Sequence, residues 1–265
     1  MPIIDHDALI KPENDQVIWR YLDLEKFESI LRDKGLFFCR SDKFSDPFEA
    51  TIPKLESLNR VKEELSAAAF HGRKMTQEEA VEKSQQIADL HKRFRRAFIV
   101  NCWHINIGES DAMWRLYLKT NEGVVIQTTV GKLRESFSDY KEELYISKVR
   151  YLDYANKGWY DRNDYPIEHY NLFTPIVHKR TAFVHETELR IFQQIEEAVN
   201  NENYWNDKAN YIGKLITCDI EVLIDKIIMP PTADDFVKNK IDALLKKYEI
   251  QRDVEPSKLN EQPYY

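Results

Sequence analysis

Short apolar runs with strand-like composition alternate along this chain with segments of helical periodicity. The runs at 17–23, 97–103 and 122–129 are rich in β-branched and aromatic residues, and the run at 143–154 alternates apolar and polar positions. The intervening helical segments do not follow the regular strand–helix–strand rhythm of a parallel α/β fold. We therefore predict an α+β class, with a mixed, largely antiparallel sheet core flanked by helices.

The chain has 265 residues and shows no internal repeat, low-complexity tract or linker rich in Pro and Gly. We expect a single domain over 1–265. Its two additions are a helical insertion at about 55–96 and a C-terminal strand–helix extension at about 210–265.

Polar residues and one glycine mark the expected helix ends. Asp23 is placed to cap a helix whose apolar residues follow at 24–31, and Gly35 is expected to end that helix. Thr76 and Glu79 have the spacing of a capping box at the start of the second insertion helix.

The composition excludes several classes of protein. Hydrophobic residues make up 43% of the chain and the formal net charge is −7, which is typical of a globular protein without broad electrostatic affinity for nucleic acid. No apolar run approaches the roughly 18 residues of a membrane span. Residues 1–16 lack the basic flank and apolar core of a signal peptide. We expect a cytoplasmic protein with no membrane partner, and no pattern indicates an oligomeric state.

Three cysteines, Cys39, Cys102 and Cys218, stand apart in apolar stretches. An odd number at wide spacing predicts free thiols rather than a disulfide framework. Cys102 and His104 have no second chelating pair at zinc-site spacing, and no glycine-rich phosphate loop is present. We therefore predict no bound metal.

Residues 183–192, FVHETELRIF, place charged side chains at alternating positions of an apolar run. In a strand Glu186, Glu188 and Arg190 would point to the same side, because side chains alternate with period two. Apolar residues on both faces argue against a solvated edge. The stretch is therefore interpreted as a catalytic pair of carboxylates or as part of a buried network of ion pairs.

Three further stretches place polar groups among apolar ones. Arg20 lies between two aromatic residues in the first expected strand, and Arg40, Asp46 and Glu49 surround a turn at Pro47. The third stretch is CWHINIGESDAMWRLY, and its polar and aromatic residues are His104, Glu109, Ser110, Trp114 and Tyr117. Each stretch also has a purely structural interpretation, such as a turn, a helix cap or core packing. Together they supply an arginine for phosphate, rings for stacking and paired carboxylates, which favours a nucleotide-like ligand.

The order of these motifs resembles a bacterial family catalogued as domain of unknown function 2971. The resemblance rests on WRYLDLEKFESILRDKGLFFCRSDKFSDPFEA, then CWHINIGESDAMWRLY with EGVVIQT, then KR..F.HETELR, over about residues 17–192. The closing DIEVLIDKIIMPP and VEPSKL also fit the family, so the resemblance covers nearly the whole chain. The family name implies no activity.

A second resemblance does imply one. ADP-ribosyltransferases have a strand bearing Arg or His, a helix, a turn into a second strand and a late Glu-x-Glu strand, as do Arg20, FESILRDKGLFF and Glu186-x-Glu188 here. The Ser-Thr-Ser motif of the arginine class is absent. The resemblance implies NAD as a substrate cleaved at the nicotinamide–ribose bond. Glu188 would stabilise the positive sugar, Glu186 would orient or deprotonate the acceptor, and Arg20 would bind the pyrophosphate or the ribose. The other ligand contacts it implies are Tyr21, Arg40, Ser41, Trp114 and Tyr117.

Three alternatives stay open on the sequence alone. Arg20, Asp46, Glu188 and Arg190 are expected to form a buried ion-pair network if the stretch is structural. A nucleotide-sensing or partner-binding module of a stress or anti-phage system would bind a nucleotide without turnover. A metal-assisted hydrolase or nuclease would use Glu186 and Glu188 as ligands.

Overall fold

The computed structural model describes residues 2–159, 171–201, 204, 212–263 and 265. Part of the expected C-terminal extension, residues 210–211 and 264, lies outside these ranges. The helices and the mixed, mostly antiparallel sheet confirm the predicted α+β class. None of the helices in the described ranges is both long and apolar enough to cross a membrane.

The main sheet has ten strands within the described residues. Its principal order is β1–β6–β9–β4–β2–β5–β11–β12, and β3 pairs with both β4 and β10. Neighbours are antiparallel except for the outer pairs β1–β6 and β11–β12. The bounds are β1 Ile3–Ile4, β2 Val17–Asp23, β3 Gly35–Arg40, β4 Phe98–Ile105, β5 Gly123–Thr129, β6 Leu144–Lys148, β9 Glu188–Gln194, β10 Gly213–Thr217, β11 Lys226–Ile228 and β12 Val254–Glu255.

A second, two-stranded sheet pairs β7 with β8 in parallel. The expected strand at 143–154 is therefore wrong as a single element, because β6 ends at Lys148 and β7 leaves the main sheet. The bounds are β7 Arg150–Leu152 and β8 His178–Arg180.

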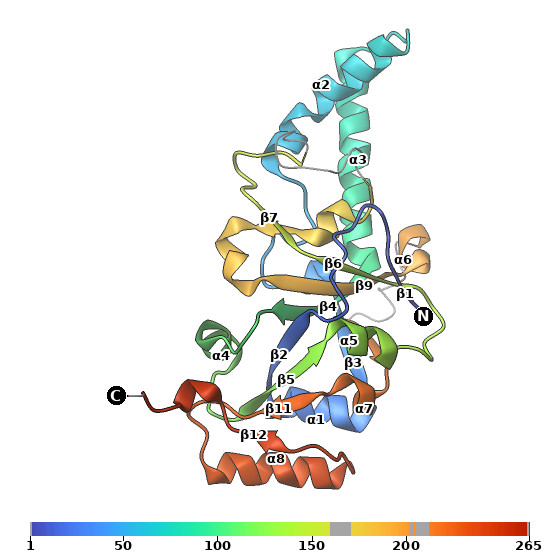
Figure 1. Ribbon diagram of the computed structural model, residues 1–265. Coiled ribbons are helices and arrows are strands. Elements are labelled where there is room, and N and C mark those ends of the chain that lie inside the picture. The colour runs from blue at the N-terminus through green and yellow to red at the C-terminus, as the bar shows by residue number, and fades with distance from the viewer. Residues whose placement is uncertain (1, 160–170, 202–203, 205–211, 264) are drawn as a thin grey trace.

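Helices cover the sheet and extend from it. In Figure 1, α2 and α3 project from one end of the molecule, while α8 lies at the opposite end beside β12. The α2–α3 hairpin occupies the place of the expected insertion, and Thr76 and Glu79 form the expected capping box. The bounds are α1 Leu24–Asp33, α2 Lys54–Phe70, α3 Gln77–Ala97, α4 Asp111–Tyr117, α5 Val130–Ser136, α6 Glu196–Asn200, α7 Ile220–Leu223 and α8 Asp235–Lys247, with short 3-10 turns at Ser41–Lys43, Thr174–Val177, Thr181–Glu186 and Lys258–Asn260.

The junction of β2, α1 and β3 follows the sequence closely. The Asp23 carboxylate accepts a hydrogen bond from the Lys26 amide and caps α1, as expected. The helix ends at Asp33, and the left-handed residue that caps it is Lys34, with φ 45°, and not Gly35. Gly35 instead begins β3 opposite Thr217 of β10. Its lack of a side chain therefore serves strand pairing rather than helix termination.

Replacing Gly35 with alanine is expected to destabilise the protein by about 1–3 kcal/mol. A Cβ at this position would lie 2.5 Å from the carbonyl oxygen of Ile216, which belongs to the backbone of the paired strand and cannot rotate away. Urea denaturation checks the loss. Gly108→Ala is the control, because a Cβ there meets nothing within 4 Å. Equal stabilities of the two variants would contradict the close approach.

The two faces of β9 differ in chemistry. Leu189 and Ile191 join the largest apolar core on one face. Glu188 and Arg190 lie on the opposite face and are also buried. The expected shared face of these two residues is therefore confirmed by the alternation of the strand.

Glu186 does not belong to this strand, contrary to the sequence-based expectation. Residues 181–186 form a 3-10 turn, and Thr187 then adopts a left-handed backbone with φ 37°. This conformation is uncommon for a β-branched residue and bends the chain just before Glu188. The two glutamates are therefore brought together by a kink and not by strand alternation.

Candidate functional site

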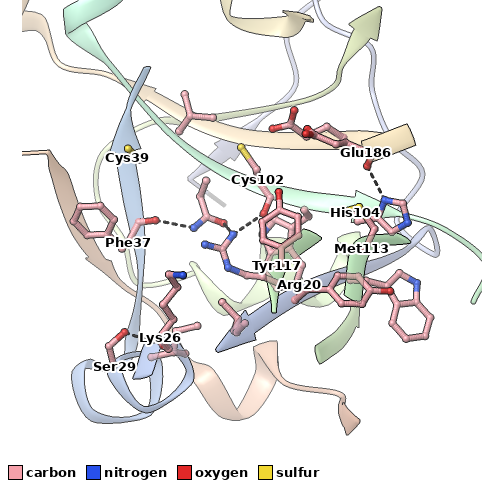
Figure 2. Close-up of a pocket in the computed structure, with 18 of the residues that line it drawn as sticks. Arg20, Lys26, Ser29, Phe37, Cys39, Cys102, His104, Met113, Tyr117 and Glu186 are labelled. Atoms are coloured by element: carbon pink, nitrogen blue, oxygen red, sulfur yellow. Dashed lines mark hydrogen bonds between the residues drawn. The ribbon is translucent and has the colours of Figure 1, made fainter. Parts of the chain in front are cut away.

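A cavity of ≈650 Å³ opens between β2, β3, β4, α4 and the kink before β9. Five of the predicted site residues line it, namely Arg20, Tyr21, Tyr117, Glu186 and Glu188. In Figure 2, Arg20 and Tyr117 lie in the middle of the cavity wall, with His104 and Glu186 on one side and Phe37, Lys26 and Ser29 on the other. The structure thus brings the expected arginine and the expected carboxylates to one open pocket.

Arg40, Ser41 and Trp114 do not line this cavity. Phe37 and Cys39 of β3 face it, so the alternation of the strand turns Arg40 to the other side, where it pairs with Asp42 at 2.8 Å.

Ser41 and Trp114 serve the packing of the fold instead. The Ser41 hydroxyl donates a hydrogen bond to the carbonyl oxygen of Arg95. The Trp114 ring lies in an apolar cluster, 5.0 Å from the ring of Tyr21, and its indole donates to Glu109. Both residues therefore lie outside this cavity, and their described contacts are with other parts of the fold.

Beside the cavity, five buried charged residues form an ion cluster consisting of Glu49, Lys179, Glu186, Glu188 and Arg190. Lys179 Nζ lies 3.0 Å from Glu49, 2.5 Å from Glu186 and 3.3 Å from Glu188. Arg190 Nη2 lies 2.8 Å from Glu49 and 3.0 Å from Glu188. Three carboxylates thus face two cations, and the cluster carries one negative charge in excess when every group is ionised.

The composition of this cluster differs from the expected network. Glu188 and Arg190 are paired, as expected, but Arg20 and Asp46 are not members. Asp46 accepts two hydrogen bonds from Arg180, at 2.6 and 3.0 Å. The sequence did not indicate Lys179, because it comes from β8, a strand that pairs outside the main sheet.

The two glutamates of the cavity differ in how their oxygens are used. Both oxygens of Glu188 accept hydrogen bonds from Arg190, at 3.1 and 3.0 Å. Its Oε2 also accepts from Lys179 at 3.3 Å. Glu186 uses only Oε2, which accepts from Lys179, while Oε1 has no hydrogen-bond partner among the described residues. The free oxygen of the pair therefore belongs to Glu186.

The pKa values of these carboxyls are shifted in opposite directions. Burial would raise the pKa of Glu188, but the charges of Arg190 and Lys179 outweigh it and lower the pKa to about 2. Burial raises the pKa of Glu186, and the single contact with Lys179 does not offset it. A fixed carboxylate beside one that can change its protonation is a pattern that acid–base sites use.

Arg20 lies in the cavity without a carboxylate partner among the described residues. Its Nη1 donates to the Asn101 side chain at 3.0 Å and to the carbonyl oxygen of Cys102 at 2.5 Å. Nε and Nη2 make no hydrogen bond to described residues, and the guanidinium lies 5.7 Å from the centre of the Trp103 ring. Burial lowers the pKa of Arg20, yet a guanidinium stays charged at neutral pH. Nε is buried, so the positive charge and the unbonded Nη2 group are what an anion can use.

The other reactive groups of the cavity are held in their neutral forms. Burial raises the pKa of the Cys102 thiol well above its ordinary value, and the charge of Glu188 adds to this shift. Burial also raises the pKa of Tyr117, and it raises that of Tyr21 to about 12. Cys102 is therefore no thiolate nucleophile, and the tyrosines contribute rings and hydroxyls.

Among the described residues the three cysteines are free, as expected. No group of three or more His, Cys, Asp or Glu side chains in the described ranges is arranged to hold a metal ion. No family model, curated protein or solved structure matches this chain. The two family resemblances stay predictions, and the geometry of the cavity carries the functional argument.

Proposed function

We propose that this chain is an NAD-cleaving enzyme of the ADP-ribosyltransferase type, whose substrate lies in the cavity between Arg20 and Glu186. The observation that carries this proposal is the pair of unbalanced charges on the cavity walls. Within the described residues Arg20 has no counter-ion, and the ion cluster has one negative charge in excess. NAD carries an anionic pyrophosphate and a cationic nicotinamide ring, so its charges complement both walls.

The excess negative charge is best assigned to Glu186. No described residue bonds to its Oε1, whereas both oxygens of Glu188 are held by Arg190. Breaking the nicotinamide–ribose bond releases neutral nicotinamide and leaves positive charge on the sugar, which a neighbouring carboxylate stabilises. We therefore assign charge stabilisation to Glu186, in place of Glu188 as expected from the sequence, and we assign to Glu188 the positioning of Lys179 and Arg190.

The size and lining of the cavity also suit a nucleotide. Its ≈650 Å³ falls within the range of small-molecule sites. Phe37 and Tyr117 line it and expose 41% and 44% of their surface, so their rings are accessible for stacking on a base or on nicotinamide.

Replacing Arg20 with glutamine is expected to weaken NAD binding about 10–100-fold, because a charge-assisted hydrogen bond contributes about 1.5–3 kcal/mol. Isothermal titration calorimetry measures the affinity, and release of nicotinamide measures turnover. Arg115→Gln is the control, since Arg115 pairs with Asp111 on the surface.

Equal affinity of the wild type and Arg20→Gln would contradict the assigned anion site. Binding of NAD or another nucleotide by the wild type without nicotinamide release would favour the sensing module. Release that depends on a divalent cation would favour the metal-assisted hydrolase.

A further inference from the structure

His104 lies on β4 directly opposite Glu188 of β9, and its side chain is only 4% exposed. Its Nδ1 is 2.6 Å from the carbonyl oxygen of Glu186. A carbonyl oxygen can only accept a hydrogen bond, so Nδ1 carries the hydrogen and Nε2 carries the free lone pair. Figure 2 shows this contact at one side of the cavity. The fold thus fixes the ring in one tautomer.

His104 lines the cavity, and its buried Nε2 has no hydrogen-bond partner among the described residues. The nearby polar groups do not donate to it. The Tyr21 ring is 6.2 Å from the imidazole and its hydroxyl accepts from the Ser110 amide, but this hydroxyl makes no hydrogen bond to Nε2. The Glu188 carboxylate is ionised and can only accept. A buried acceptor without a partner costs about 1–3 kcal/mol. A cavity ligand with an O–H or N–H group would satisfy it.

Burial lowers the pKa of His104. The hydrogen bond to the Glu186 carbonyl oxygen acts in the opposite direction, and the nearby His185 lowers the pKa further. The ring is therefore neutral and able to accept a proton at neutral pH. A histidine whose Nδ1 is oriented by a fixed acceptor and whose Nε2 is free has the geometry of a general base.

We propose that His104 is a further catalytic residue, whose Nε2 removes the proton from the hydroxyl or water that attacks the ribose. This inference rests on the proposed cleavage of NAD. The acceptor oxygen forms a bond to the ribose carbon, the bond from that carbon to nicotinamide breaks, and its electron pair leaves with neutral nicotinamide. The acceptor proton moves to His104, and the resulting imidazolium returns it to solvent.

Of the reactive groups that line the cavity, His104 is the one suited to deprotonate the acceptor. Glu186 was expected to deprotonate the acceptor, but one of its oxygens is bound to Lys179 and the other is needed as the negative charge beside the sugar. Cys102 cannot take part as a thiolate because the pKa of its thiol is raised. His104, in contrast, lines the cavity, and no described residue uses the lone pair of its buried Nε2.

The test is His104→Asn, assayed by nicotinamide release. An asparagine amide can still donate to the Glu186 carbonyl oxygen, so the structural hydrogen bond is retained and only the base is lost. We expect turnover to fall about 10²–10⁴-fold, with NAD affinity and thermal stability close to those of the wild type. His178→Asn is the matched control, because His178 is also buried with Nδ1 at a carbonyl oxygen, that of Thr174, but does not line the cavity.

A second variant guards against a change that is merely structural. In His104→Ala, added imidazole is expected to restore part of the turnover, whereas it should not restore that of Glu186→Gln. Full turnover of His104→Asn, or no rescue of His104→Ala, overturns the role of His104 while leaving NAD cleavage intact. Absence of nicotinamide release by the wild type overturns the proposed function itself and this inference with it.

Discussion

Replacing Arg190 with methionine is expected to lower the free energy of unfolding by about 3–5 kcal/mol at neutral pH. The side chain is 1% exposed and its donors all meet oxygens, those of Glu188, Glu49 and the Ile176 carbonyl. Methionine fills much of the space but leaves the three buried carboxylates of the ion cluster with Lys179 as their remaining cation. Urea denaturation at pH 7 measures the loss.

Two further variants identify the cause of this loss. Arg115→Met removes an arginine from an exposed pair and is expected to change stability by no more than about 0.5 kcal/mol. In the double variant Arg190→Met with Glu188→Gln, part of the loss should be recovered, because the unpaired buried charge is removed. If the double variant is less stable than Arg190→Met alone, the loss arises from packing and the ion cluster has a smaller role than inferred.

The destabilisation by Arg190→Met should also depend on pH. The pKa of Glu188 is lowered from 4.5 to about 2 in the folded protein, so the unfolded chain takes up this proton more readily. The stabilisation from Glu188 is therefore fully present above about pH 4.5 and is lost as the pH falls towards 2. Since the variant lacks most of this stabilisation, its stability should approach that of the wild type across this interval. A constant difference would contradict the linkage.

Local patterns in the sequence predicted much of the fold because their causes are local. Asp23 caps α1 and Thr76 begins α3 through hydrogen bonds to residues three positions later. The run at 97–103 predicted a strand from its continuous apolar composition, and all but two residues of β4 are buried. Such features need no knowledge of distant contacts.

The candidate site depends on contacts that no local pattern reveals. Lys179 reaches the glutamates because β8 pairs with β7 outside the main sheet, and Glu49 arrives from a turn far away in the sequence. The kink at Thr187 could not be predicted, because a β-branched residue is a poor signal for a left-handed backbone. His104 stands out in the sequence as a polar residue among apolar ones, but its free lone pair became visible only with the Glu186 carbonyl in place.

Arg20 and Trp114 were both predicted to contact a ligand, but only Arg20 lines the cavity. In the sequence, each is a charged or aromatic side chain beside apolar neighbours. Arg20 keeps unused donors in the cavity, whereas Trp114 lies one helical position from Met113, which does line it, and faces the core. Residue type alone therefore did not separate them, because the direction of each side chain decides whether it lines the cavity or packs in the core.

Glu186→Gln is expected to reduce nicotinamide release about 10²–10³-fold, because it removes the negative charge that faces the developing positive sugar. The substitution should leave the protein folded. A carboxylate at this position is not needed for charge balance, since Glu49 and Glu188 still balance Lys179 and Arg190. Stopped-time assays of nicotinamide at saturating NAD measure turnover, and a thermal unfolding curve measures whether the variant stays folded.

Glu49→Gln is the matched control for this prediction. It also removes one carboxylate from the ion cluster and also leaves the charges balanced, but Glu49 does not line the cavity. It should therefore retain turnover. A loss of turnover in both Glu49→Gln and Glu186→Gln would mean that the net charge of the ion cluster supports activity, rather than the position of the Glu186 carboxylate in the cavity. Glu188→Gln decides the remaining assignment. If it abolishes turnover in a folded protein while Glu186→Gln does not, Glu188 is the residue beside the sugar and the fixed pair with Arg190 supplies the charge.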